Sequence, residues 1–207
     1  MDVLYAVAHP LIIARFGHER WRQLCCLVIS VASASVLCLH YDAYIADVRT
    51  FVPSSMQVNI FTRSYFSIDM LHITYTILDG RGCRHDLLLH HMIGMCFCFT
   101  INHWIGMTFV TIAEVLSIFP LFTKSRLMLA WLRTCTIILI RFLLWTHLAY
   151  HHCYVKYQQY DAVALVAITS GACAFSCFDL FFLGRSLRVI VDSLPARPRS
   201  LIVNQME

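Results

Sequence analysis

Charged side chains are scarce in this sequence. Only 14% of its residues are charged, whereas 59% are hydrophobic and the mean hydropathy is +0.67. A soluble domain carries about 25% charged residues, so this chain has too little polar surface to cover a particle in water. Its Lys and Arg residues form no run, and the formal net charge is only +4. The composition predicts a membrane protein and gives no support to nucleic acid as a partner.

The CxxC pattern is absent, although the chain has ten cysteines. Only Cys83 and Cys153 fall near the ends of apolar stretches, and the other eight lie within them. A buried cysteine behaves as a small apolar side chain, and structural zinc sites favour CxxC pairs. We therefore predict no disulfide framework, no structural metal site and no cofactor.

The N-terminal region lacks the pattern of a cleavable signal peptide. Residues 1–14 have no basic start, contain Pro10 and precede arginines rather than small residues. Their apolar part is too short to cross a bilayer. We therefore assign residues 1–20 to an N-terminal interfacial segment.

Six apolar segments approach the roughly 20 residues that a spanning helix needs. None shows the alternation of a membrane strand, and the sequence contains no internal repeat. We predict an all-α membrane protein, with a bundle of about six transmembrane helices in residues 21–188 and a polar cytosolic tail at 189–207. The predicted helices lie near 23–40, 60–79, 86–101, 103–122, 126–147 and 161–184.

Basic residues are distributed unevenly between the two ends of these helices. Six spans place both termini on one side, which carries eleven Lys and Arg residues, against three on the other side. Positive charge collects in the cytosol, so we predict that both termini are cytosolic. The smaller group is Arg49, Arg63 and Lys156; the larger is Arg15, Arg20, Arg22, Arg81, Arg84, Lys124, Arg126, Arg185, Arg188, Arg197 and Arg199.

Ionisable side chains converge at one predicted depth. The third and fourth helices meet at Asn102-His103, and about twelve residues separate this turn from both His91 and Glu114. At 1.5 Å per residue, both lie about 18 Å from the turn. The same counting around the turn at Thr123-Lys124 places Arg133 at the depth of Glu114. Ionisable groups at membrane depth usually mark a functional site, which makes His90, His91 and Glu114 candidate catalytic residues.

Further polar residues are candidate supporting or lipid-binding groups. Asp86 precedes His90 by four residues on the same helix face, from which it would orient the imidazole. Arg141 lies near the middle of its helix, with Asp69 as one candidate partner. Structural alternatives stay open: histidines bonded to backbone, a Glu114–Arg133 pair, or an Arg133 that reaches the interface. The supporting set is Asp69, Asp86, Ser117, Arg133 and Arg141.

A second histidine group, His147, His151 and His152, has a spacing like that of histidine-box enzymes. Combined with His85, His90 and His91, it would suggest a di-iron desaturase or hydroxylase. The predicted topology separates the two groups by roughly 20–30 Å, whereas metal ligands lie within about 2.2 Å of their ion. We favour a solvated helix end, and metal binding by the second group alone stays open.

The order of these residues resembles the TLC-domain family, the membrane domain of ceramide synthases, translocon-associated TRAM proteins and small lipid-homeostasis proteins. The similarity runs from about Trp21 to Arg188. It comprises a tyrosine-and-aspartate helix at 65–69, a histidine-pair signature at 86–91, an "E-x-S-x-P" region at 114–120 with extra residues, and Arg141 in the following helix.

Two departures from the family pattern indicate which members of the family the chain resembles. Ceramide synthases have two aspartates, three residues apart, in the helix after the histidine pair, whereas this chain has Glu114 and Ser117. The resemblance therefore favours the small TLC-domain proteins. Asp179 stands where those relatives often have an asparagine followed by a tryptophan, and the tryptophan is absent here.

The resemblance implies a multi-pass protein of the endoplasmic reticulum that takes part in lipid homeostasis and binds a membrane lipid through its acyl chain in a polar pocket. One alternative is an acyltransferase with acyl-CoA as co-substrate and His90 or His91 as general base. Another is a cargo- or partner-binding membrane protein. Whether the chain is an enzyme, which lipid it binds and whether it forms a homo-oligomer stay open.

Overall fold

The protein is all-α, as predicted. The computed structural model describes residues 2–80, 84–101 and 104–194, and these contain helices, connecting segments and one isolated bridge between Phe51 and Trp104, without a strand. Several residues used in the sequence predictions lie outside the described ranges: Arg81, Cys83, the Asn102-His103 turn, Arg197 and Arg199.

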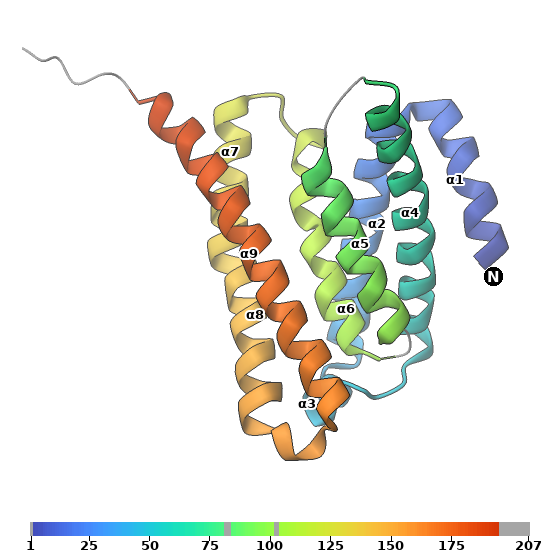
Figure 1. Ribbon diagram of the computed structural model, residues 1–207, viewed down its shortest axis with the longest axis vertical. Helices are drawn as coiled ribbons and strands as arrows, with labels where there is room; N and C mark the ends of the chain where they lie inside the picture. Colours follow the sequence, from blue (N-terminus) through green and yellow to red (C-terminus); the bar gives the residue numbers. More distant parts are fainter. Residues whose placement is uncertain (1, 81–83, 102–103, 195–207) are drawn as a thin grey trace, which may run out of the picture.

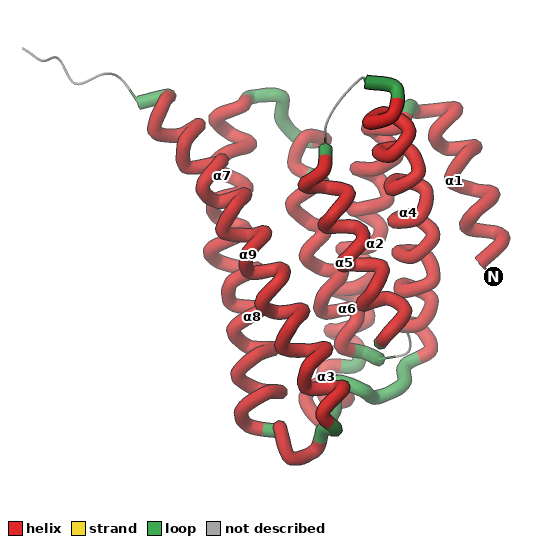
Figure 2. The backbone as a smooth tube through the Cα atoms, viewed as in Figure 1, coloured by secondary structure: helices red, strands yellow, loops and turns green. Residues whose placement is uncertain are grey.

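The helices pack into one bundle, with the N-terminal helix on its edge beside α4 (Figures 1 and 2). The elements are α1 (Asp2–Phe16), α2 (His18–Leu39), α3 (Tyr41–Ala46), α4 (Pro53–Leu78), α5 (His85–Thr100), α6 (Gly106–Thr111), the 3₁₀ turns η1 (Ile112–Ser117) and η2 (Phe119–Leu121), α7 (Arg126–Thr136), the π turn η3 (Ile137–Arg141), α8 (Phe142–Leu148), the π turn η4 (Ala149–Val155), the 3₁₀ turn η5 (Tyr157–Gln159) and α9 (Ala162–Asp192).

Three helical runs are long and apolar enough to cross a membrane. They are His18–Leu39 with 22 residues, Arg126–Val155 with 30 and Ala162–Asp192 with 31. A helix rises 1.5 Å per residue, so each exceeds the roughly 30 Å hydrocarbon core of a bilayer. The chain therefore has the helices of an integral membrane protein.

Each of the six predicted segments coincides with a helix or a helical run, but several boundaries differ. α4 begins at Pro53, before the predicted 60, because proline is well suited to the first turn of a helix. α9 continues to Asp192, past both the predicted 184 and the 188/189 domain boundary. Polar residues continue a helix outside hydrocarbon, so apolar length underestimates helix length.

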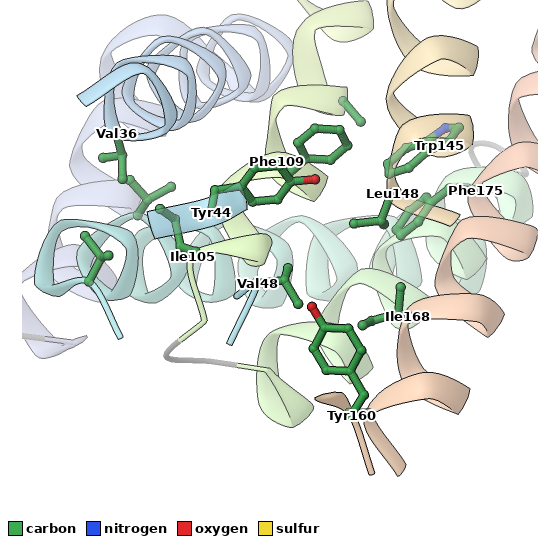
Figure 3. Close-up of a cluster of buried hydrophobic side chains, with 14 residues drawn as sticks. Val36, Tyr44, Val48, Ile105, Phe109, Trp145, Leu148, Tyr160, Ile168 and Phe175 are labelled. Carbon is green, nitrogen blue, oxygen red and sulfur yellow. The ribbon is translucent and has the colours of Figure 1, made fainter. Parts of the chain in front are cut away.

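A buried apolar cluster fills the end of the bundle that carries α3 (Figure 3). Tyr44 of α3 stacks on Phe109 of α6, with ring centroids 5.1 Å apart. Gly106, the first residue of α6, lies against Val48, whose side chain a Cβ at this position would overlap. Glycine is therefore needed where the segment after α3 approaches α6.

The same end of the bundle holds two of the three basic residues that were predicted to lie away from the cytosol. Arg49 donates to the Asp47 carboxylate at 2.9 Å and to the Gln159 carbonyl at 2.8 Å, and Lys156 donates to the Ala46 carbonyl at 2.8 Å. The hydrogen bond that Arg49 donates to the Asp47 carboxylate raises the pKa of Arg49. These contacts join the segment after α3 to the segment between η4 and α9.

Candidate functional site

The histidine pair of α5 meets Glu114 in the interior of the bundle. His90 Nε2 lies 3.0 Å from Glu114 Oε1, and the second carboxylate oxygen lies 3.6 Å from Cys26 Sγ of α2. His91 is fully buried, and Phe66 of α4 stacks on its ring at a centroid distance of 4.6 Å. The structure thus brings together the three side chains that the sequence proposed as catalytic.

Close helix packing positions this pair. Gly94 lies one turn after His90 and His91 on α5, and a Cβ added there would lie 2.6 Å from Phe66 Cε2. Small residues let helix backbones approach closely in membrane proteins. Gly94 therefore brings α4 near enough for Phe66 to cover the imidazole of His91.

Asp69 is buried between two imidazoles. Its Oδ1 lies 2.6 Å from His18 Nε2, and its Oδ2 lies 3.2 Å from His91 Nδ1. His18 also stacks on His72 at a centroid distance of 3.4 Å. Sequence reasoning missed His18, because it precedes the predicted helix and no local pattern relates it to Asp69, 51 residues away.

Arg141 pairs with Asp179, which corrects the suggested pairing with Asp69. Arg141 Nε lies 2.9 Å from Asp179 Oδ1, and Trp145 Nε1 donates to Asp179 Oδ2 at 2.6 Å. Both charged side chains are buried, with exposed fractions of 2% and 0%. Arg141 ends the π turn η3 and faces α9, so its partner comes from α9 rather than from α4.

The contacts of Asp86 differ from the predicted ones, and Arg133 does not form the alternative ion pair with Glu114. The Asp86 carboxylate lies 3.3 Å from Arg84 Nε and 3.8 Å from Arg185 Nη1, so its ion-pair partners are guanidinium groups rather than the imidazole of His90. Glu114 contacts His90, and Arg133 lies instead on a cavity wall. Equal depth did not make Arg133 and Glu114 an ion pair among the described residues, because rotation about the helix axis also decides contact.

A cavity of about 440 Å³ opens beside the histidine pair. It lies among α2, α5, η1, α7 and α9, at the end of the bundle where α7 begins and α9 ends (Figure 1). His90 lines it, whereas His91 does not. Its polar lining comprises six arginines, namely Arg22, Arg84, Arg126, Arg133, Arg141 and Arg185, together with Glu19, His90, Glu114, Ser117 and Ser186.

The remaining lining is apolar, and half of it lies on α7 and α9. Leu129 and Ala130 share the inner face of α7 with Arg126 and Arg133, at the three- and four-residue spacing of one helix face. Phe182 and Val189 likewise share one face of α9 with Arg185 and Ser186. The cavity therefore combines a cationic lining with an apolar wall.

His90, His91 and Glu114 also have the donor atoms for a metal. One donor atom from each lies within 4.8 Å of the others, and all three residues are buried. The arginines of the cavity produce a positive potential here, which favours anions and opposes a divalent cation. The arrangement is better suited to binding an anion or to transferring a proton than to holding a metal ion.

The second histidine group lies elsewhere. The His147 and His151 rings are 5.3 Å apart in α8 and η4, near the α3 end of the bundle, and the side chain of His152 is outside the described set. His85, His90 and His91 belong to the first half of α5, which begins at the opposite end (Figure 1). The fold does not join the two groups.

Comparisons with known proteins add no relative. No protein family, no curated protein and no solved structure matches the chain.

Proposed function

We propose that this chain is a multi-pass, TLC-like membrane protein of lipid homeostasis, which binds an acyl lipid in the cavity beside His90. The observation that carries the proposal is a cavity of about 440 Å³ with a cationic, histidine-containing lining and an apolar wall in a membrane protein. Ligand sites combine an apolar enclosure with a few convergent polar groups. An acyl lipid has a polar head group for the cationic lining and an apolar chain for the apolar wall.

The proposed topology has six spans: α2, α4, α5, α6 with η1 and η2, the run from α7 to η4, and α9. Both termini lie in the cytosol, and the membrane is that of the endoplasmic reticulum. Arg84, Arg126 and Arg185 lie at the cavity end, whereas Arg49 and Lys156 lie together at the other. The positive-inside rule then places the cavity in the cytosolic half.

Bound lipid in the purified protein tests the proposal. Native mass spectrometry of the chain purified in mild detergent should show co-purified acyl lipid. Ala130→Trp should abolish it, because Ala130 is buried on the cavity wall and an indole there fills the space. Leu127→Trp is the matched control, since Leu127 is exposed on the same helix and does not line the cavity. Absence of lipid from the unmodified protein, or equal loss in both variants, would refute the proposal.

Acyl transfer is a second candidate, favoured by the His90–Glu114 contact at the cavity. With Nε2–H donated to Glu114, the Nδ1 atom of His90, which has no hydrogen-bond partner among the described residues, would accept a proton from an attacking amine or hydroxyl. Purified protein should then transfer the acyl group from acyl-CoA to one of a set of lipid acceptors, and His90→Ala should slow this transfer by about 10²–10⁴-fold. Full activity in His90→Ala would exclude this role.

A further inference from the structure

Building on the proposed lipid-binding function, we infer that the head group held in this cavity is a dianionic phosphate, such as a phosphate monoester. The inference comes from the charge balance of the cavity, from two guanidinium groups without ion-pair partners, and from buried N–H groups without acceptors.

The charges around the cavity do not balance. Six arginines line it, and four carboxylates, those of Glu19, Asp86, Glu114 and Asp179, contact these arginines or His90. Six guanidinium groups against four carboxylates leave an excess of two positive charges among the described residues. Arg126 is exposed and Arg133 is half-buried, so water stabilises part of this charge. The excess nevertheless creates a positive potential that attracts anions, and a ligand with two negative charges would neutralise it.

Two arginines of α7 account for the excess. Arg22 is held by Glu19 at 2.8 Å, Arg141 by Asp179 at 2.9 Å, and Arg84 and Arg185 share Asp86. Arg126 and Arg133 have no ion-pair partner within the described part of the chain. They are seven residues apart on the inner face of α7, on either side of Leu129 and Ala130. An anion between them would contact both.

Buried donors point to an acceptor with several oxygens. Arg141 Nη2 and Arg22 Nε are buried without a hydrogen-bond partner among the described residues. A buried donor without an acceptor is destabilising, and guanidinium groups bind phosphate oxygens in a bidentate manner. A carboxylate head group supplies one charge and two oxygens, whereas a phosphate monoester carries close to two charges and three free oxygens.

The test compares lipids that differ only in the head group. Native mass spectrometry would measure the Kd of detergent-solubilised protein for phosphatidic acid (a monoester), phosphatidylglycerol (a diester) and diacylglycerol (no phosphate), all with the same acyl chains. We expect phosphatidic acid to bind about 10-fold more tightly than the diester and about 100-fold more tightly than diacylglycerol. Equal affinity for monoester and diester would overturn the inference.

Matched variants locate the phosphate. The Arg126→Gln/Arg133→Gln double variant should remove the preference for the monoester, while Arg188→Gln should keep it, because Arg188 lies on α9 outside the cavity lining. Neither α7 arginine has an ion-pair partner within the described residues, so the double variant should fold and elute as the unmodified protein does. Retention of the full preference by the double variant would also overturn the inference.

The remaining outcomes separate this inference from the proposed function. Diacylglycerol binding as tightly as phosphatidic acid would support lipid handling and refute the phosphate. Binding of none of the three lipids would refute the proposed function itself. Soluble glycerol 3-phosphate competing at the concentration at which phosphatidic acid binds would support the phosphate and show that the acyl chain is dispensable, which would contradict lipid binding.

Discussion

The buried carboxylates of this bundle have different kinds of partner. Asp69 lies between the imidazoles of His18 and His91, Glu114 contacts the imidazole of His90, and Asp179 contacts the guanidinium of Arg141. Ionised groups within a membrane protein are tolerated when they pair with one another inside the bundle. Only the partner of Asp179 carries a permanent charge, so this pair depends most on both members being present.

Removing one member of the Arg141–Asp179 pair should therefore destabilise the fold strongly. Asp179→Ala leaves a buried guanidinium unpaired, and we expect a loss of about 3–5 kcal/mol in the free energy of unfolding. Thermal unfolding in detergent would measure it, with the exposed Asp42→Ala as the control. The double variant Arg141→Met/Asp179→Leu should regain most of the loss. A double variant as unstable as Asp179→Ala would show that the two residues act separately.

At this scale, the sequence predicted which residues would be buried more reliably than it predicted their partners. Counting from turns placed His91 and Glu114 at one depth, and the structure brings them together. The same counting placed Arg133 at this depth, where it does not pair with Glu114, and the sequence did not identify the actual partners of Arg141 and Asp86. Depth follows from the rise per residue, whereas contact also requires the rotation of each helix, which depends on the packing of the whole bundle.

Among the elements, α1 contacts the bundle through apolar side chains and one buried histidine. His9 Nδ1 accepts a hydrogen bond from Trp21 Nε1 of α2 at 2.9 Å, and its ring packs against Phe61 of α4. The helix has 15 residues with Pro10 inside it, and its place in the membrane interface stays a prediction. Burial lowers the pKa of His9 below its ordinary value of 6.5.

The docking of α1 should consequently weaken in acid. Because the pKa of His9 is lower in the folded state than in the unfolded one, its contribution to stability is complete above pH 6.5 and falls as the pH drops below that value. Hydrogen exchange of residues 2–16 should become faster at pH 5 than at pH 7.5, relative to α9. His9→Gln should make the ratio independent of pH. Unchanged relative protection in the unmodified protein would argue against this role of His9.

The existence of the helices was predictable from sequence, while their irregular turns were not. Hydropathy located six apolar segments, and each coincides with a helix or a helical run. Three of these runs are long and apolar enough to cross a bilayer, so the count of six spans stays a prediction. The 3₁₀ turn at Ile112–Ser117 and the π turns at Ile137–Arg141 and Ala149–Val155 leave no comparable signal, because side-chain composition is similar in α, 3₁₀ and π geometry. These turns nevertheless decide where Glu114 and Arg141 point.

For the molecule as a whole, the proposed orientation makes a direct prediction. An N-glycosylation acceptor in a long loop inserted between Gln158 and Gln159 should be modified, because this end of the bundle faces the lumen in the proposed topology. The same loop inserted between Thr123 and Lys124, at the opposite end, should not be. Gel mobility before and after deglycosylation measures the outcome. Modification only of the loop inserted between Thr123 and Lys124 would show that the orientation is the reverse of the proposed one.

The π turn before Arg141 has a consequence for the length of its helix. In a regular α-helix, two residues eight positions apart, such as Arg133 and Arg141, differ by about 80° around the axis. A π turn changes this angle, and both guanidinium groups line the cavity. Deleting Ile138 would leave the segment as apolar as before and, because a π turn holds one residue more than an α turn, would convert it to a regular α-helix in which seven positions place Arg133 and Arg141 about 20° apart. The helix would then be one residue shorter, and both guanidinium groups should still face the cavity.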